Sequence, residues 1–222
     1  RIYVRFQAMI DVALLRRVLV RGLINPWIWL ALPVLAVLTM GFAHLGVDAT
    51  VNEIARAQNS TLSIAWSAFP MLAGIVAPVL CPIYLAITGK RDLATRTLGA
   101  LLLSLIVVSL LKGITSRVHP EALEPIGILA KSQSFRFGLL QSGLQSLVEG
   151  WPSGHAATNG AVGLVLARLT RSRHVRTLAY GWIAWVALAT VFGISGDVHW
   201  LSDTLCGLAI AGLLAWTVLK VG

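Results

Sequence analysis

The chain has 222 residues, of which 57% are hydrophobic and 12% are charged, and its mean hydropathy is +0.80. This composition excludes an ordinary soluble globular domain and indicates an integral membrane protein. The formal net charge is +9. Cys81 and Cys206 each lie in an apolar run, which supports neither a disulfide framework nor a zinc site of spaced cysteines.

Residues 1–21 mix apolar side chains with five arginines. This pattern predicts an amphipathic interfacial helix that lies at the membrane face and binds anionic lipids there. A solvated tail is the alternative. The basic layout has no signal-peptide pattern, which favours a bacterial inner membrane.

Long uncharged runs after this segment predict membrane-spanning helices. Only helices and closed barrels satisfy every backbone polar group in lipid, and a spanning helix needs about 20 apolar residues. The fold is therefore predicted to be all-α, with a six-helix bundle as the single transmembrane domain of residues 1–222. The six predicted spans cover residues 23–44, 62–87, 94–112, 154–169, 177–195 and 201–219.

The lysines and arginines are distributed unevenly about these spans. Most of them lie at the start of the chain, in the turns after the second and fourth spans, and at the end, and all these segments share one side. The positive-inside tendency places that side, with both termini, in the cytoplasm and the opposite side in the periplasm. Topology and anionic lipid explain the basic excess, so no nucleic-acid partner is expected.

The outer side contains a pair of ionisable residues in the stretch before and within the sixth span. His199 and Asp203 are four residues apart, so on a helix they share a face and the carboxylate can accept the ring N–H. The other ring nitrogen then remains as a nucleophile or base. A structural pair that ties two helices together is the alternative.

Two further outer segments carry residues suited to an anion. Ser153 and Gly154 are small and leave backbone N–H groups open at the start of the fourth span, where the helix dipole favours negative charge. His155 follows as a candidate acid, and Lys112 at the outer end of the third span offers a point charge for phosphate. A helix cap and a lysine that reaches the interface are the alternatives, but the joint occurrence favours a site.

In order and spacing these residues resemble the membrane branch of the type 2 phosphatidic acid phosphatase superfamily. Its pattern is K-x6-R-P, then P-S-G-H, then S-R-x5-H-x3-D. The resemblance in motifs extends from Lys112 to Asp203, and the rest of the chain is similar in topology. It implies that His199 attacks phosphorus to form a phosphohistidine while Asp203 orients it.

The same resemblance implies roles for the other motif residues. His155 would protonate the leaving oxygen and later activate water. Lys112, Ser153 and the Gly154 amide would hold the phosphate oxygens. No metal ligand and no cofactor are expected.

Two arginines of the family pattern are absent. His119 occupies the position of the first, and Phe192 and Gly193 occupy the serine and arginine of the last motif. Such arginines stabilise charge on phosphoryl oxygens, where one donor is worth about 10²- to 10³-fold in rate. Arg117 and His119 are therefore candidate substrate-binding residues, with Arg136 as a further possibility; an ordinary solvated arginine is the alternative for both arginines.

The outer loop of residues 113–150, between the third and fourth spans, is longer than a plain connection. From Phe135 onward its apolar residues have helix-like spacing, which predicts a helix along the membrane surface or a short helix packed on the bundle as a lid. Trp27, Trp151 and Trp200 are predicted interface anchors, and a place in the wall of the site is the alternative for the last two.

Three functions follow from these observations. The leading one is a metal-independent lipid phosphatase that acts at the outer face on a phosphate monoester or diphosphate of a membrane phospholipid or polyprenyl phosphate. The second is a lipid phosphotransferase that passes a phosphoryl or phospho-head group to an alcohol, which the missing arginines fit better. A non-catalytic lipid-binding protein is the third, and the retained nucleophile and acid argue against it.

Overall fold

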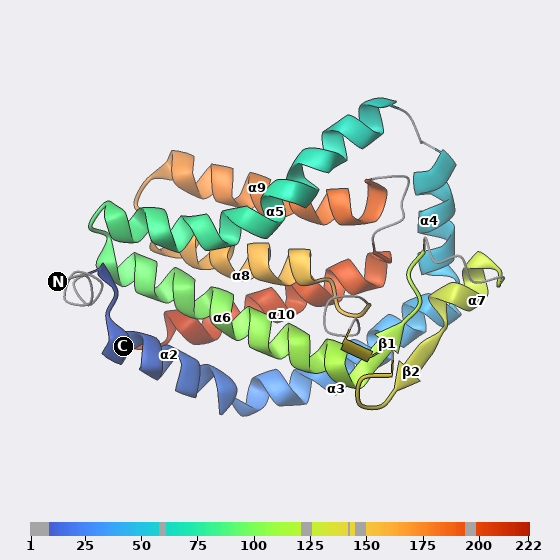
Figure 1. Ribbon diagram of the computed structural model, residues 1–222, viewed down its shortest axis with the longest axis horizontal. Helices are drawn as coiled ribbons and strands as arrows, with labels where there is room; N and C mark the ends of the chain where they lie inside the picture. The colour runs from blue at the N-terminus through green and yellow to red at the C-terminus, as the bar shows by residue number, and fades with distance from the viewer. Residues whose placement is uncertain (1–8, 58–60, 121–125, 142, 145–149, 194–198) are drawn as a thin grey trace.

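A computed structural model describes residues 9–57, 61–120, 126–141, 143–144, 150–193 and 199–222. This part of the chain is helical apart from a two-stranded ribbon and the connecting loops (Figure 1). The helices are α2 (Val12–Leu23), α3 (Pro26–His44), α4 (Val47–Ala57), α5 (Thr61–Ile87), α6 (Arg91–Ile114), α7 (Ile128–Ser132), α8 (Gly154–Leu169), α9 (Arg173–Phe192) and α10 (Leu201–Leu219). The strands are β1 (Thr115–Arg117) and β2 (Phe135–Phe137).

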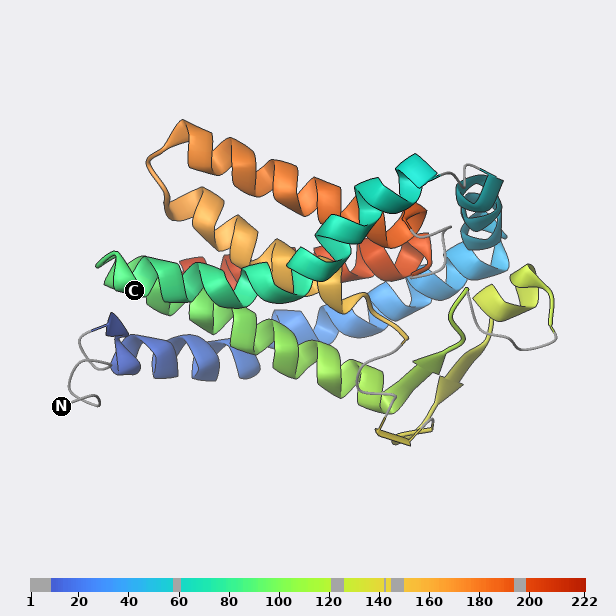
Figure 2. The ribbon, with the colours of Figure 1, turned by 45° about the horizontal axis from the view of Figure 1, so that its top comes forward.

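The long helices run side by side along the molecule. α8 lies at the centre and packs against α10, α9, α6 and α5, while α2 packs against α6 and α10, and α3 against α10. Figure 1 and Figure 2 show α4, α7 and the ribbon together at one end of the bundle. The start of α2 and the C-terminus lie at the opposite end. The predicted outer segments are therefore gathered away from both ends of the described chain.

The helical fold class is confirmed, and each predicted span falls on one helix. Within the described residues, five helices are long and apolar enough to cross a membrane: α3, α5 from Ala65, α6, α9 and α10. The fourth predicted span is α8, whose 16 residues reach only about 24 Å at 1.5 Å per residue, less than a hydrocarbon core of about 30 Å. A sixth span through α8 stays a prediction.

Close contact between α8 and α10 joins the two helix starts that carry the predicted motifs. A Cβ added to Gly207 would lie 2.5 Å from the Ser153 carbonyl oxygen, and one on Gly160 would lie 2.7 Å from the Ala211 Cβ. Small residues of this kind let helix backbones approach each other in membranes. The Ser153 N–H also donates to the Asp203 carbonyl, at 3.0 Å. The first turns of α8 and α10 are thus held together.

The N-terminal segment is helical from Val12, and residues 1–8 of the predicted interfacial helix lie outside the described residues. Asp11 caps this helix by accepting the Leu14 N–H at 2.9 Å. Leu14 and Val18 are buried, whereas Arg16, Arg17 and Arg21 are exposed. Helix α2 is therefore amphipathic, and its position at the membrane face stays a prediction.

The helix predicted from Phe135 is wrong at its beginning. Phe135–Phe137 form β2, which pairs antiparallel with β1 so that Arg136 lies opposite Ser116. The extended backbone of β1 leaves N–H and C=O groups that need partners, and β2 supplies them. Residues 142 and 145–149 of the predicted helix lie outside the described residues.

Candidate active site

Three helix ends that are distant in sequence bring the predicted residues together. Lys112 lies in the last turn of α6, Gly154 and His155 begin α8, and His199 lies two residues before the start of α10. Lys112 and His199 are only 3% and 6% exposed. Ionisable side chains buried at this level need polar partners or a functional role.

A cavity of about 330 Å³ connects these helix ends. Its polar lining includes Lys112, His155 and His199 together with the Gly154 backbone. Its other walls are apolar and come from α5 and α6, among them Ile75, Val79, Leu101, Leu105 and Val108. The cavity therefore has one cationic, histidine-bearing region and one hydrocarbon-like region.

The imidazole of His199 is in an environment that keeps it unprotonated. Burial lowers the pKa of His199 to about 4, although the nearby Asp203 carboxylate opposes this shift. The ring nitrogen Nδ1 is 3.7 Å from Asp203 Oδ2, too far for a hydrogen bond, and Nδ1 has no hydrogen-bond partner among the described residues. The backbone N–H of His199 donates to the Thr190 carbonyl at 3.1 Å, which holds the residue at the start of α10.

His155 has a defined ring orientation. Its Nε2 is 3.1 Å from the Met71 carbonyl oxygen of α5, and because a carbonyl only accepts, Nε2 is assigned as the protonated nitrogen. Nδ1 is then the nitrogen that can exchange a proton with a substrate. Asn159, one turn later, donates to the Gly74 and His155 carbonyls at 2.8 and 2.9 Å.

Ser153 acts as the N-cap of α8. Its hydroxyl accepts the Ala156 N–H at 3.4 Å, and the side chain is buried. Gly154 follows, lines the cavity and adds no side chain between its backbone and the site. The backbone N–H groups at the start of α8 therefore give this part of the cavity a positive potential.

Arg117 uses all of its hydrogen-bonding capacity within the protein. Its Nε and Nη2 donate to the Ser132 carbonyl at 2.9 and 2.6 Å, and Nη2 donates to Asp48 Oδ2 at 2.6 Å. Its Nη1 donates to Asp203 Oδ1 and, at 3.0 Å, to Ser202 Oγ. These five bonds occupy the five N–H donors of a guanidinium. The expected substrate-binding role of Arg117 therefore has no donor left to support it.

The aromatic residues around Arg117 enclose it. The guanidinium carbon is 4.5 Å from the centre of the Phe135 ring and 5.3 Å from that of Trp200. Trp151 and Trp200 are both buried, and their indole N–H groups donate to Thr39 and Val118. The interface-anchor prediction is wrong for these two residues, because their rings pack inside the protein; Trp27 is exposed.

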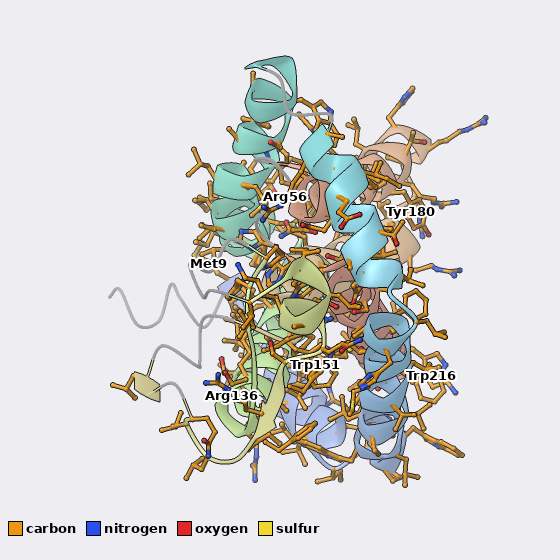
Figure 3. The ribbon with its side chains drawn as sticks, turned by 90° about the vertical axis from the view of Figure 1, so that its right-hand side faces the viewer. Met9, Arg56, Arg136, Trp151, Tyr180 and Trp216 are labelled. Atoms are coloured by element: carbon orange, nitrogen blue, oxygen red, sulfur yellow. The ribbon has the colours of Figure 1, made fainter. Side chains whose placement is uncertain are left out.

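His119 lies beside His199, with ring centres 5.8 Å apart. Its Nε2 accepts the Gly150 N–H at 2.9 Å. Neither Arg117 nor His119 is among the described residues that line the cavity. Arg136 is exposed on β2, and Figure 3, which looks onto this end of the bundle, shows it toward the edge.

A comparison with protein families agrees with this geometry. The family model described as the PAP2 superfamily matches residues 93–222, which is more than half of the chain. The chain belongs to the PAP2 superfamily. The family predicted from the motifs is confirmed, and membership makes the protein a phosphatase- or phosphotransferase-type membrane enzyme. No curated protein and no solved structure matches the chain.

One of the departures from the PAP2 pattern has a steric cause. A Cβ on Gly193 would overlap the Ala189 carbonyl oxygen and the Ser67 side chain of α5. The chain at this point leaves no space for the arginine that the pattern places there, unless both α5 and the last turn of α9 move. The PAP2 site of this protein is therefore built around a close contact between α5 and the end of α9.

One residue that contacts this site lies outside the part matched by the PAP2 family model. Asp48 of α4 is fully buried and contacts both Arg117 and Ser202. Sequence reasoning missed it, because a single acidic residue in a short outer helix has no motif around it. The amphipathic pattern of α4 could have indicated that Asp48 is buried, since Asp48 shares a face of the helix with Asn52 and both are buried.

Proposed function

We propose that the protein is a metal-independent lipid phosphatase acting on a phosphate monoester or diphosphate of a membrane phospholipid or polyprenyl phosphate. The proposal rests on the cavity, which has one cationic, histidine-bearing region and one apolar region. Ile75, Val79 and Leu105 of its apolar wall are 62%, 45% and 46% exposed, so they face the hydrocarbon of a surrounding membrane. A phosphate can bind beside Lys112 while its lipid chain extends along this wall.

In the first step, Nε2 of His199 attacks phosphorus and the bond from phosphorus to the lipid oxygen breaks. The lipid oxygen takes a proton from Nδ1 of His155, which enters the step as an imidazolium and leaves it neutral, and the products are a phosphohistidine and the released lipid. Positive charge develops on the His199 ring, which Asp203 stabilises through Nδ1–H. The 3.7 Å separation has to shorten to about 2.8 Å for this hydrogen bond, a tightening common when substrate binds.

In the second step, water attacks the phosphohistidine and loses a proton to His155. The phosphorus–nitrogen bond breaks, and its electron pair returns to Nε2 of His199. Lys112, the Gly154 N–H and the dipole of α8 supply the positive field for the phosphoryl oxygens in both steps. With these groups the reaction needs no metal ion.

The proposed orientation follows from charge. Arg16, Arg17, Arg21 and Lys220 lie near the end of the bundle that contains the C-terminus. The polar lining of the cavity, by contrast, comes from the helix ends close to α4 and the ribbon. The positive-inside tendency favours the basic end in the cytoplasm. We therefore place both termini in the cytoplasm and the active site at the periplasmic face of a bacterial inner membrane.

A lipid phosphotransferase is the second candidate, and the charge of the cavity favours it. Lys112 is the one cationic side chain among the described residues that line the cavity. A phosphate monoester carries up to two negative charges, whereas a phosphodiester carries one and needs less compensation. With a diester, His199 would displace the lipid alcohol, and an acceptor alcohol would then take the phospho-head group from the histidine.

Product analysis separates these candidates. Purified protein is incubated with labelled phospholipids and polyprenyl phosphates, with and without alcohol acceptors, and free phosphate and new lipids are followed. Free phosphate supports the phosphatase, and labelled acceptor lipid supports the phosphotransferase. If neither product appears while the protein remains folded and binds the lipid, catalysis is ruled out for these substrates and the non-catalytic alternative is favoured.

A further inference from the structure

Asp48 reaches the active site from a helix that precedes the matched family region. Gly46, with φ of 73°, turns the chain from α3 into α4, and α4 packs against α7, α9 and α10. This packing buries Asp48 completely. A carboxylate with no solvent exposure is costly unless charged or polar partners surround it.

The first partner of Asp48 is the start of α10. The N-cap residue Trp200 has no side-chain hydrogen bond to this helix. Instead, Asp48 Oδ1 accepts the Ser202 N–H at 3.0 Å, and Oδ2 accepts the Ser202 hydroxyl at 2.6 Å. Asp48 therefore caps α10 from another helix, where its negative charge also suits the helix dipole.

The second partner of Asp48 is Arg117, which lies between two carboxylates. Arg117 Nη2 donates to Asp48 Oδ2 at 2.6 Å and Nη1 donates to Asp203 Oδ1. With Oδ1 occupied in this way, Asp203 directs Oδ2 toward Nδ1 of His199. Asp48, Arg117 and Asp203 thus form a buried chain of charges that ends at the proposed nucleophile.

The charge of this cluster matters during the reaction. Two carboxylates and one guanidinium leave one negative charge in excess, next to the His199 ring. Without Asp48, Arg117 would neutralise Asp203, and the positive charge that develops on His199 would lose its counter-charge. Charge held in place before reaction, where water is excluded, stabilises a transition state effectively.

We propose that Asp48 is a positioning residue that fixes the Asp203 carboxylate against His199, through Arg117 and through the start of α10. The role rests on the proposed function, since it concerns the nucleophile of that reaction. Asp48 is not among the described residues that line the cavity. Helix α4 would therefore contribute to catalysis without contact with the substrate.

The first test is kinetic and uses Asp48→Asn, which keeps the shape of the side chain but removes its charge. We expect kcat to fall by about 10- to 100-fold, the usual effect of losing one charged hydrogen-bond partner, with KM changed less than about twofold because the cavity lining is intact. Glu53→Gln, the same change at an exposed position of α4, is the matched control and should retain the wild-type rate. An unchanged kcat in Asp48→Asn, with active wild type, overturns the proposal.

The second test does not need turnover. Histidine labelled with nitrogen-15 reports the protonation of each ring nitrogen, and His199→Ala assigns the His199 signals. We expect a single Nδ1-protonated form in the wild-type protein and in Glu53→Gln, and a mixture of ring forms in Asp48→Asn. Identical spectra in wild type and Asp48→Asn overturn the proposal. If the wild type turns over no lipid but the spectra differ as expected, the proposed function fails and the positioning role stands.

A milder variant covers the case in which Asp48→Asn does not fold. Ser202→Ala removes one hydrogen bond to Asp48 and one from Arg117 but keeps all three charges. We expect a fall in kcat of several-fold, smaller than that of Asp48→Asn, with KM unchanged. A wild-type kcat in this variant, with a single His199 ring form retained, contradicts the proposed link between Asp48 and His199.

Discussion

Residues 93–222, which the PAP2 family model matches, and the residues before them contribute differently to one site. The candidate reacting groups all belong to the matched part: Lys112, His155, His199 and Asp203. The preceding part contributes the Asp48 carboxylate to Arg117 and the Met71 carbonyl to His155. In the proposed reaction, one part of the chain therefore carries the reacting groups, and the other holds side chains of that part in place.

The contacts of Gly193 and Arg117 account for the lack of an arginine among the described residues that line the cavity. Ser67 of α5 occupies the space that a side chain at position 193 would need. Arg117, which lies two residues before His119, is bound between the carboxylates of Asp48 and Asp203. The positive charge of the cavity is then left to Lys112 and to the start of α8. The following predictions test the two contributions separately.

The largest effect is expected for His199→Ala, which removes the proposed nucleophile from the matched part. Turnover should fall by at least about 10³-fold, as is usual when a group that forms a covalent intermediate is lost, while circular dichroism and gel filtration remain unchanged. His174→Ala, at an exposed position of α9, is the control and should be fully active. A folded His199→Ala variant with normal turnover would refute the assignment.

Lys112→Gln should lower kcat/KM by about 10²- to 10³-fold, because it removes the cation beside the phosphate while leaving a similar side-chain length. Steady-state rates with the lipid substrate found by product analysis measure this effect. Lys90→Gln, which is exposed in the turn before α6, should have no effect. A loss of less than tenfold in Lys112→Gln would indicate that another group holds the phosphate.

The pH dependence should reflect the buried state of His199. Protonation removes the lone pair that attacks phosphorus, so the rate falls as pH decreases through the pKa of His199, which burial lowers to about 4. At pH 5.5, protonation of His199 should therefore cost kcat/KM almost nothing, whereas a nucleophilic histidine with an ordinary pKa of about 6.5 would lose roughly tenfold. Measurement of kcat/KM between pH 4 and 8 tests this expectation, and an acid limb near 6.5 would contradict it.

The smallest effect is expected for Gly74→Ala, which probes the part before the matched region. The added Cβ would lie 3.3 Å from both His155 Cδ2 and Asn159 Nδ2, so the His155 ring has to shift by a few tenths of an ångström. We expect a rate loss of a few-fold, well below the hundredfold that a displacement of about 1 Å can cause. Gly41→Ala is the matched control, because its new Cβ would have no atom within 4 Å other than those of its chain neighbours and of its own helix backbone. Equal rates in both variants would show that α5 does not position the His155 ring.

The helices and the order of the motifs were accessible from sequence because local signals define them. The apolar runs predict six spans, and helices α3, α5, α6, α8, α9 and α10 begin and end within a few residues of them. The Ser153 cap was likewise readable from the small residues before an apolar run. The strand Phe135–Phe137 was not, because its pairing with β1 outweighs the helix-like spacing of its own side chains.

Composition determined that this is a helical membrane protein, and the order of the motifs produced its resemblance to a phosphoryl-transfer family, since hydrophobic length and motif order are properties of the chain itself. Only the tertiary structure decided which groups surround Arg117. Arg117 is distant from Asp48 and Asp203 in sequence, and its five N–H groups found partners through the packing of α4, α7 and α10. Burial of a guanidinium requires such compensation, and no sequence pattern specifies which distant carboxylates provide it.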